Sequence, residues 1–452
     1  MRRLLTGILI LGLSVPAFAM GRKPAPSSTL ADQITRSYNA RAEDGLLSGA
    51  SIGVFNERYK DEPLELTFGD AETSQDRFEI GSISKSFTGI LLSKLILEGK
   101  ISLDAPIEDL IPELKGTFVG SVSAHLLATH SARLVDDASG DFQFTETDLV
   151  TYLKGYIPAK DRPVGERHYS NLGFMTLSLL MSHATGERFV DLVQKQIFKP
   201  LHMSGSGYLN SKNAFRRILK PHTALLEVTS YDLLLDVADG AGGVYSNLDD
   251  MTKFLHANLD PQSAPLLTEA IVFSQILGLG WDSDPGASVI WKNGAMTGFG
   301  SIIQMNPAAH TGVIVLCNSR CTSSATALAS IAMGGPDQFK ADLPISGDVK
   351  ASVVGTYFHT NGKDLVDVVI NSEGFLGLHL RETGDADFYS LRLRKQAEDR
   401  MSVFDGLGTT ADDYVEFGSD PATGKKQLHY FEWESQDAHG NSVFTETVFT
   451  QK

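Results

Sequence analysis

A serine and a lysine in residues 78–85, FEIGSISK, have a spacing that can make the serine reactive. Lys85 follows Ser82 by three residues, and residues three apart lie on the same face of a helix. A serine hydroxyl needs a base to take its proton, and a lysine amine serves when burial and neighbouring cations lower its pKa. Ser84 has no basic residue at the matching spacing. The pair predicts Ser82 as a nucleophile, although Ser-x-x-Lys alone also occurs on ordinary solvated helices.

A tyrosine and an asparagine form a second candidate motif in the segment PVGERHYSNLGF. Tyr169 and Asn171 are two residues apart, so a turn would direct both side chains into one cleft. The phenol could relay a proton between nucleophile and leaving group, and the amide could bond a substrate carbonyl. By itself, Tyr-x-Asn is equally typical of a loop with a capping asparagine.

The third candidate motif is WKNGAMTGFG, in which a strand lysine precedes two small residues. Lys292 and Asn293 are followed by Gly294 and Ala295, which would let a substrate backbone lie alongside as an added strand. The N–H groups of Ala295 and Ser82 would form an oxyanion hole, where one donor contributes roughly 3–4 kcal/mol to catalysis. Alone, this segment reads as an ordinary hairpin.

Taken together and in this order, the three motifs resemble those of the serine β-lactamase and penicillin-binding-protein superfamily, Ser-x-x-Lys, Tyr-x-Asn and Lys-Thr-Gly. The similarity is greatest to class C β-lactamases, low-molecular-weight D-Ala-D-Ala peptidases and esterases with the same fold. It extends over about residues 30–335 through further segments: GKISLDAPIEDLIPEL, AHLLATHSARL, IFKPLHM, GAGGVYSNLDDM and LGLGW.

The resemblance implies a role for each candidate residue. Ser82 would carry the acyl group, Lys85 would be its base partner, and Tyr169 would relay the proton. Asn171 would orient the acyl side chain, and Lys292 would attract anionic substrate and tune the Tyr169 phenol. Asn293, Gly294 and Ala295 would line the substrate strand. The resemblance implies no cofactor and no metal ion.

Two departures from the family pattern concern substrate recognition. Asn293 stands where the family has a threonine whose hydroxyl helps to bind a carboxylate; Thr297 or the Asn293 amide would have to replace it. The sequence HSARL replaces His-Thr-Ser-Gly and places Arg133 near the expected cleft rim. Neither change touches Ser82, so the sequence predicts the nucleophile more sharply than the substrate.

Other reactive arrangements receive less support from the sequence. There is no Gly-x-Ser-x-Gly and no His-Glu-x-x-His, and we expect His125 and His130 to pack and not to bind metal. Glu166 is expected to be a loop residue, not a deacylation base. Cys317 and Cys321 are four apart and either close a small disulfide loop or stay as two thiols; without a companion histidine they cannot form a structural zinc site.

The composition and the N-terminus restrict partners and location. The chain has 452 residues and a formal charge of −16, which argues against binding to nucleic-acid phosphates. Residues 1–19 begin with two arginines, continue with a short apolar run and end in Ala-Phe-Ala, the pattern of a cleaved signal sequence. The run is shorter than the roughly 20 residues that span a bilayer. We therefore expect a periplasmic or secreted protein without a stable membrane span.

The order of the predicted elements indicates an α+β fold. Strands at both ends of the first region, with helices between them, predict an antiparallel sheet flanked by helices. By resemblance this is the β-lactamase-like sheet with an inserted all-α cluster. The expected division is a signal peptide (1–19), a hydrolase domain (20–335), a linker (336–349) and a small β-barrel (350–452), with a weaker likeness to lipocalins.

Four hypotheses for function remain open at this stage. The first is a penicillin-binding D-Ala-D-Ala carboxypeptidase or endopeptidase acting on peptidoglycan peptides. The second is an esterase or amidase on the same fold, which Asn293 favours, and the third is an efficient β-lactamase. The fourth is a non-catalytic protein that binds through its barrel. The substrate would be a peptide, a β-lactam or an ester, and the sequence does not specify the oligomeric state.

Overall fold

The computed structural model describes most of the chain. The described residues are 28–135, 145–159, 163–209, 217–231, 238–283, 286–361, 363–382, 389–395, 401–404, 413–436 and 442–451. The predicted signal sequence, residues 1–19, lies outside them. Among the helices that are described, none has both the length and the apolar character needed to cross a membrane.

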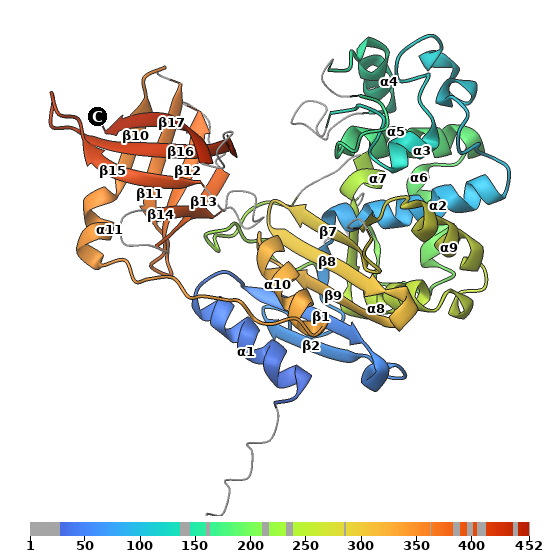
Figure 1. Cartoon of the computed structure of the whole chain (residues 1–452), viewed down its shortest axis with the longest axis horizontal. Coiled ribbons are helices and arrows are strands. Elements are labelled where there is room, and N and C mark those ends of the chain that lie inside the picture. Colours follow the sequence, from blue (N-terminus) through green and yellow to red (C-terminus); the bar gives the residue numbers. More distant parts are fainter. Residues whose placement is uncertain are drawn as a thin grey trace, which may run out of the picture.

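The first part of the chain is built on one antiparallel sheet with the strand order β2-β1-β9-β8-β7-β6 (Figure 1). The strands are β1 (Gly49–Phe55), β2 (Leu64–Gly69), β6 (Asp282–Ser283), β7 (Ile290–Met296), β8 (Phe299–Asn306) and β9 (Thr311–Cys317). β1 pairs with β9, so strands from both ends of this region meet in the middle of the sheet. This pairing explains why the two ends of the predicted hydrolase region both read as strands.

Helices cover the two faces of this sheet. On one face, α1 (Leu30–Glu43) and α10 (Thr322–Ala332) pack together and bury Ile34 and Tyr38. On the other face lies α8 (Leu248–Leu259), which contacts β1, β8 and β9. The sheet is therefore buried on both sides and presents its β7–β6 edge to the remaining helices.

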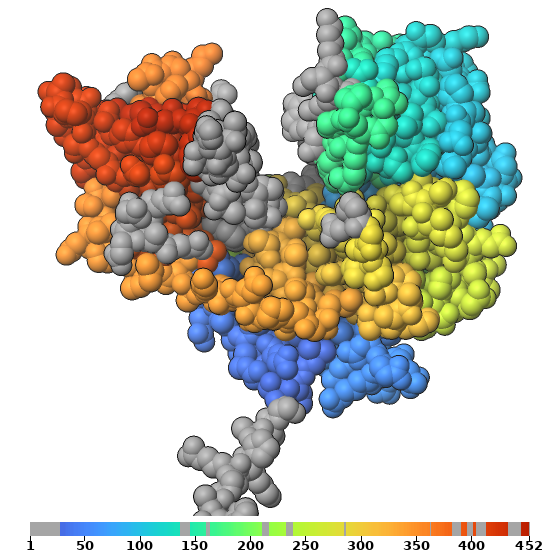
Figure 2. Space-filling view, in the orientation of Figure 1, coloured from blue at the N-terminus to red at the C-terminus, as the bar shows by residue number. Residues whose placement is uncertain are grey.

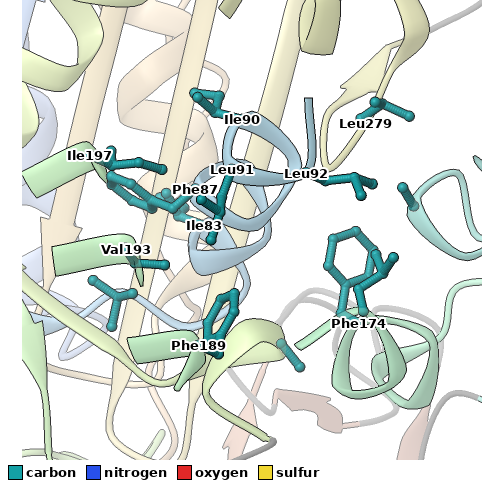
Figure 3. Close-up of a cluster of buried hydrophobic side chains, with 14 of the residues drawn as sticks. Ile83, Phe87, Ile90, Leu91, Leu92, Phe174, Phe189, Val193, Ile197 and Leu279 are labelled. Carbon is teal, nitrogen blue, oxygen red and sulfur yellow. The ribbon is translucent and has the colours of Figure 1, made fainter. Parts of the chain in front are cut away.

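The remaining helices of this region form a cluster around α2 (Ser84–Leu97). They are α3 (Ala124–Ala128), α4 (Glu146–Gly155), α5 (Asn171–Thr185), α6 (Phe189–Val193), α7 (Asp239–Gly242) and α9 (Thr268–Leu277). Eleven of the fourteen residues of α2 are buried, and Figure 3 shows apolar side chains surrounding this helix. Phe87 stacks on Phe254, with ring centroids 4.1 Å apart. A helix buried on nearly all sides gives a rigid base to whatever its N-terminus carries.

A small antiparallel sheet leads into α2. It has the order β3-β5-β4, made of β3 (Arg77–Glu79), β5 (Val244–Asn247) and β4 (Gly207–Tyr208). After β3 the chain makes one 3-10 turn, Gly81–Ile83, and enters α2 directly. Ser82 therefore lies on the turn between a strand and a buried helix.

The C-terminal strands form a closed, consecutively ordered antiparallel barrel. They are β10 (Gly355–His359), β11 (Asp364–Ile370), β12 (Leu376–Glu382), β13 (Tyr389–Arg394), β14 (Met401–Phe404), β15 (Tyr414–Ser419), β16 (Lys426–Gln436) and β17 (Ser442–Gln451). Pairing of β10 with β17 closes it, so each described strand of the barrel has a neighbour on both sides. The short helix α11 (Gly347–Val353) precedes the barrel.

Partly buried ion pairs join the barrel to the first region. Arg394 of β13 bonds Asp342 of the connecting segment at 2.7 Å and lies 3.5 Å from Asp44, just after α1. The neighbouring Arg392 donates to the Gly45 carbonyl oxygen. Figures 1 and 2 show the barrel and the helical cluster rising on either side of an open notch above β7. The barrel thus flanks the approach to β7.

The α+β prediction is confirmed, including the antiparallel sheet, the helical insertion and the C-terminal barrel. β7 continues beyond Lys292 to Met296 and therefore includes the glycine that follows the lysine. Helix α11 begins inside the expected linker and ends beyond residue 349. The division of the chain into domains stays a prediction.

Candidate active site

The turn that carries Ser82 lies directly against β7. Gly81 has φ +51°, a left-handed conformation that favours glycine, and a Cβ there would come 2.8 Å from the Ala295 nitrogen. The backbone of the turn that carries Ser82 therefore approaches the backbone of β7 more closely than a side chain at position 81 would allow. This places the Ala295 backbone beside the start of α2, where an oxyanion hole was predicted.

The Ser82 hydroxyl has two polar neighbours, one on α2 and one in the segment that precedes α5. Its Oγ lies 2.6 Å from the Tyr169 phenol oxygen and 3.0 Å from Lys85 Nζ. Ser82 is half-buried, whereas Lys85 beside it is fully buried. The structure therefore brings together Ser82, Lys85 and Tyr169, three of the four residues that the first two motifs singled out.

The Lys85 ammonium is fully buried and has several acceptors. Besides Ser82, it donates to Asn171 Oδ1 and to the Ala241 carbonyl oxygen, both at 2.6 Å. The Ala241 oxygen comes from α7, which the sequence did not mark as part of the site. Three acceptors match the three N–H groups of a protonated lysine, which offsets the cost of burying its charge.

Ser170 fixes the position of Tyr169 through the start of α5. Its hydroxyl caps that helix by accepting from Gly173 N at 2.9 Å, and it donates to the Val135 carbonyl oxygen at 2.6 Å. The Ser170 N–H donates to His130 Nδ1 at 3.0 Å. These bonds hold the residues on both sides of the cap, so the phenol of Tyr169 has little freedom to leave Ser82.

Lys292 of β7 is buried beside the same phenol. Its Nζ lies 4.9 Å from the centre of the Tyr169 ring and 2.9 Å from Asp282 Oδ2. Burial lowers the pKa of Lys292, the Asp282 carboxylate opposes that effect, and the Arg167 cation adds to it. Lys85 Nζ is also 4.9 Å from the Tyr169 ring centre. Two lysine side chains therefore surround one phenol.

Asp282 and Arg167 belong to this group, and the sequence analysis did not identify them. Asp282 is the first residue of β6, is 8% exposed, and accepts from both Lys292 and Arg167. The signal available was LGLGW, because Asp282 is the residue that directly follows this family-like segment. A buried strand lysine needs a carboxylate nearby, and an acidic residue on the neighbouring strand can provide it.

The residues after Lys292 alternate along β7. Gly294 is buried, and a Cβ there would lie 2.0 Å from the Ile80 carbonyl oxygen. Ala295 is exposed and Asn293 is half-buried, so these two lie on the more accessible side of the strand. Glycine is therefore required at 294 for β7 to approach the residues that precede the nucleophile.

Local contacts engage three residues to which the sequence analysis gave no catalytic role: Arg133, Glu166 and Ser84. Arg133 donates to the Ala159 carbonyl oxygen and lies over the Phe118 ring. Glu166 is exposed and pairs with His168 at 3.9 Å. Ser84, the alternative serine, is buried and accepts from Val244 N at 3.1 Å, which agrees with its rejection as nucleophile.

Neither histidine of the segment AHLLATHSARL is in a metal-binding cluster, and the described residues contain no group of three or more His, Cys, Asp or Glu that could hold a metal ion. His125 pairs with Asp104 at 3.5 Å. His130 packs on Tyr169, with ring centroids 4.5 Å apart. The pKa of His130 is lowered to about 2, mainly by burial and further by the cations Lys292, Lys85 and Arg167. This histidine is thus a neutral packing residue.

Cys317 and Cys321 form a disulfide at the end of β9. The sequence left open a small disulfide loop or two thiols, and the structure has the disulfide loop. Cys317 Sγ lies 3.2 Å from the Gly300 carbonyl oxygen of β8, and β8 separates this disulfide from β7.

Comparison with known families agrees with this geometry. The family model described as Beta-lactamase matches residues 63–333, which is more than half of the chain. The chain belongs to the beta-lactamase family. The match includes every candidate site residue, from Ser82 to Ala295, and excludes the barrel.

Individual relatives of this beta-lactamase family member are distant. A protein named Beta-lactamase from Yersinia enterocolitica is 24% identical over 67% of this chain and 90% of its own length. A Beta-lactamase from Escherichia coli K12 is 25% identical over 64% of this chain and 88% of its own length. Protein flp from Staphylococcus aureus N315 is 22% identical, and the match covers 63% of this chain and 62% of that protein.

Replacement of Gly294 by alanine should separate β7 from the nucleophile turn. The added Cβ meets the Ile80 oxygen at 2.0 Å, so we expect about a 100-fold loss of activity and a loss of stability of about 1–3 kcal/mol. Gly155→Ala is the matched control, because nothing lies within 4 Å of its Cβ. Kinetic assays and thermal unfolding of both variants test this. An active Gly294→Ala variant with unchanged stability would contradict the close approach.

Because the folded protein keeps His130 neutral, acidification should destabilise the fold. The unfolded state takes up a proton below about pH 6.5 and the folded state only near pH 2, so stability contributed by this group falls as the pH drops through that range. In His130→Gln the change in free energy of unfolding between pH 7 and pH 4 should be smaller by about 3 kcal/mol. Urea unfolding at both pH values measures it, with half-exposed His125→Gln as control. Identical pH dependence in wild type and His130→Gln would refute the prediction.

Proposed function

We propose that this serine hydrolase works through an acyl-enzyme on Ser82. The observation that carries the proposal is that Ser82 Oγ lies within hydrogen-bond distance of both Lys85 Nζ and the Tyr169 hydroxyl. Family membership supports hydrolysis at the level of the family. It does not assign a substrate to this chain.

The hydrogen bonds favour Tyr169 as the group that takes the Ser82 proton. Lys85 uses N–H donors toward Ser82, Asn171 and the Ala241 oxygen, which is the pattern of an ammonium ion. Ser82 Oγ then accepts from Lys85 and donates to the Tyr169 oxygen. The positive charges of Lys85 and Lys292, each 4.9 Å from the ring, favour negative charge on that phenol. Lys85, the base partner expected from the resemblance, would then act through Tyr169.

The proposed reaction has two steps. Ser82 Oγ bonds to the substrate carbonyl carbon as its proton passes to Tyr169, and the oxyanion is held by the N–H groups of Ser82 and Ala295. The bond to the leaving group then breaks, and Tyr169 returns the proton to that group. Water attacks the acyl-enzyme by the same route in reverse and releases the acid and free Ser82.

We propose D-Ala-D-Ala-type peptides as the first substrate candidate, with β-lactams as analogues that acylate the same serine. A second candidate, a carboxylesterase or amidase, is favoured by a specific observation. Asn293 replaces a hydroxyl residue, and the Lys292 ammonium is engaged by Asp282, so two groups expected to bind a carboxylate are altered or occupied. Residues 1–19 support a proposed export to the periplasm or the medium.

A fluorescent penicillin tests the acyl-enzyme directly. Wild-type protein should take up covalent label, and Ser82→Ala should take up none, because it lacks the attacking oxygen. Ser84→Ala is the matched control from the same turn, and it should still be labelled, since Ser84 only supports Val244 N. Labelling is read on a denaturing gel.

The outcomes separate the hypotheses. Label that survives in Ser82→Ala would overturn the assignment of the nucleophile. Absence of label, together with Ser82-dependent hydrolysis of short-chain esters, would favour the esterase. If penicillin, esters and peptidoglycan peptides all fail to react, the hydrolase proposal is wrong and the barrel-based binding protein gains support.

A further inference from the structure

One carboxylate in the site is shared between two cations of very different exposure. Asp282 Oδ2 accepts from Lys292 at 2.9 Å, and Oδ1 accepts from Arg167. The Lys292 side chain is 1% exposed, whereas the Arg167 side chain is 54% exposed. The two cations are therefore not equivalent toward anything that enters from solvent.

Lys292 is poorly placed to bind a charged group on a substrate. Its ammonium is buried, engaged by Asp282 and directed at the Tyr169 ring. Moving it toward a substrate would leave the Asp282 carboxylate in a buried position without this partner, which is costly. Lys292 therefore acts on Tyr169 and leaves substrate charge to another residue.

Arg167 has the properties that Lys292 lacks. It stands two residues before Tyr169 in the chain, and Asp282 fixes one edge of its guanidinium through Nη2. A guanidinium carries five N–H donors, so one fixed edge leaves donors for a second, planar anion. The charge count also matters, because in the described part of the chain Lys292 and Arg167 share the single Asp282 carboxylate.

We propose that Arg167, held in place by Asp282, determines whether the enzyme prefers substrates with a carboxylate next to the scissile bond. This inference rests on the proposed function, since it concerns substrates of the Ser82 site. Asn293 lacks the hydroxyl group with which the family's threonine helps to bind a carboxylate. The proposal assigns this recognition to Arg167 instead. Peptides ending in a free carboxylate would meet this arginine, and neutral esters would not depend on it.

Two matched aryl esters test the proposal. Both have the same acyl group; one has a carboxylate on the leaving phenol and the other has a carboxamide at that position. The measured quantity is the ratio of kcat/KM for the anionic ester to that for the neutral ester. In Arg167→Gln this ratio should fall about tenfold or more, the scale of one charge-assisted hydrogen bond, mainly through KM of the anionic ester. Arg167→Lys should retain part of the preference.

The control removes an equal charge elsewhere. Arg188 is exposed and pairs with Asp191 on α6, so Arg188→Gln changes the net charge by the same amount without touching the site. It should leave the ratio unchanged. The wild-type ratio should also fall with added salt, because an exposed charge is screened, and the ratio in Arg167→Gln should respond less.

The results distinguish this inference from the proposed function. Because the ratio compares two substrates on one preparation, partial misfolding of a variant does not alter it. An equal ratio in wild type and Arg167→Gln, with both esters hydrolysed in a Ser82-dependent way, would overturn the role of Arg167 alone. Hydrolysis of neither ester, nor of peptide or penicillin, would instead count against the Ser82 proposal itself.

Discussion

The burial of two lysine side chains beside one tyrosine is the constraint on which the site depends. Removing a charged group from water costs several kcal/mol, so each buried ammonium needs partners that are already in position. Lys85 finds them in Asn171 and in the Ala241 carbonyl oxygen, and Lys292 finds one in Asp282. These partners lie on α5, α7 and β6, elements far apart in the sequence. The site therefore forms only when the sheet edge and the helical cluster close around α2.

The surroundings of this charge cluster are correspondingly rigid. α2 is buried on nearly all sides, Ser170 caps α5, and glycine at 294 allows β7 to pass close to Ile80. Each feature fixes the position of one element that carries residues of the candidate site. The neutral His130 packed on Tyr169 adds an aromatic contact without adding a third positive charge. The geometry of the candidate site and the packing of the core are thus produced by the same contacts.

Much of this could be predicted from the sequence, because the informative signals are local. The spacing of Ser82 and Lys85 and the strand patterns of the barrel both lie within short windows. The contributions of Asp282 and of the Ala241 oxygen could not be predicted in this way. A backbone carbonyl carries no residue signal, and the pairing of Asp282 with Lys292 depends on which strands become neighbours in the sheet. The roles of the site residues remain predictions, to be decided by chemistry.

The central claim is that Ser82 is the residue that becomes acylated, and the tryptic fragment FEIGSISK allows a direct measurement. An aryl phosphonate ester reacts with an activated serine and stays attached. After digestion, fragmentation mass spectrometry shows which residue carries the phosphonyl group. We expect modification at Ser82 in the wild-type protein and none on this fragment in Ser82→Ala. Modification of Ser84, or of a serine outside this fragment, would contradict the account.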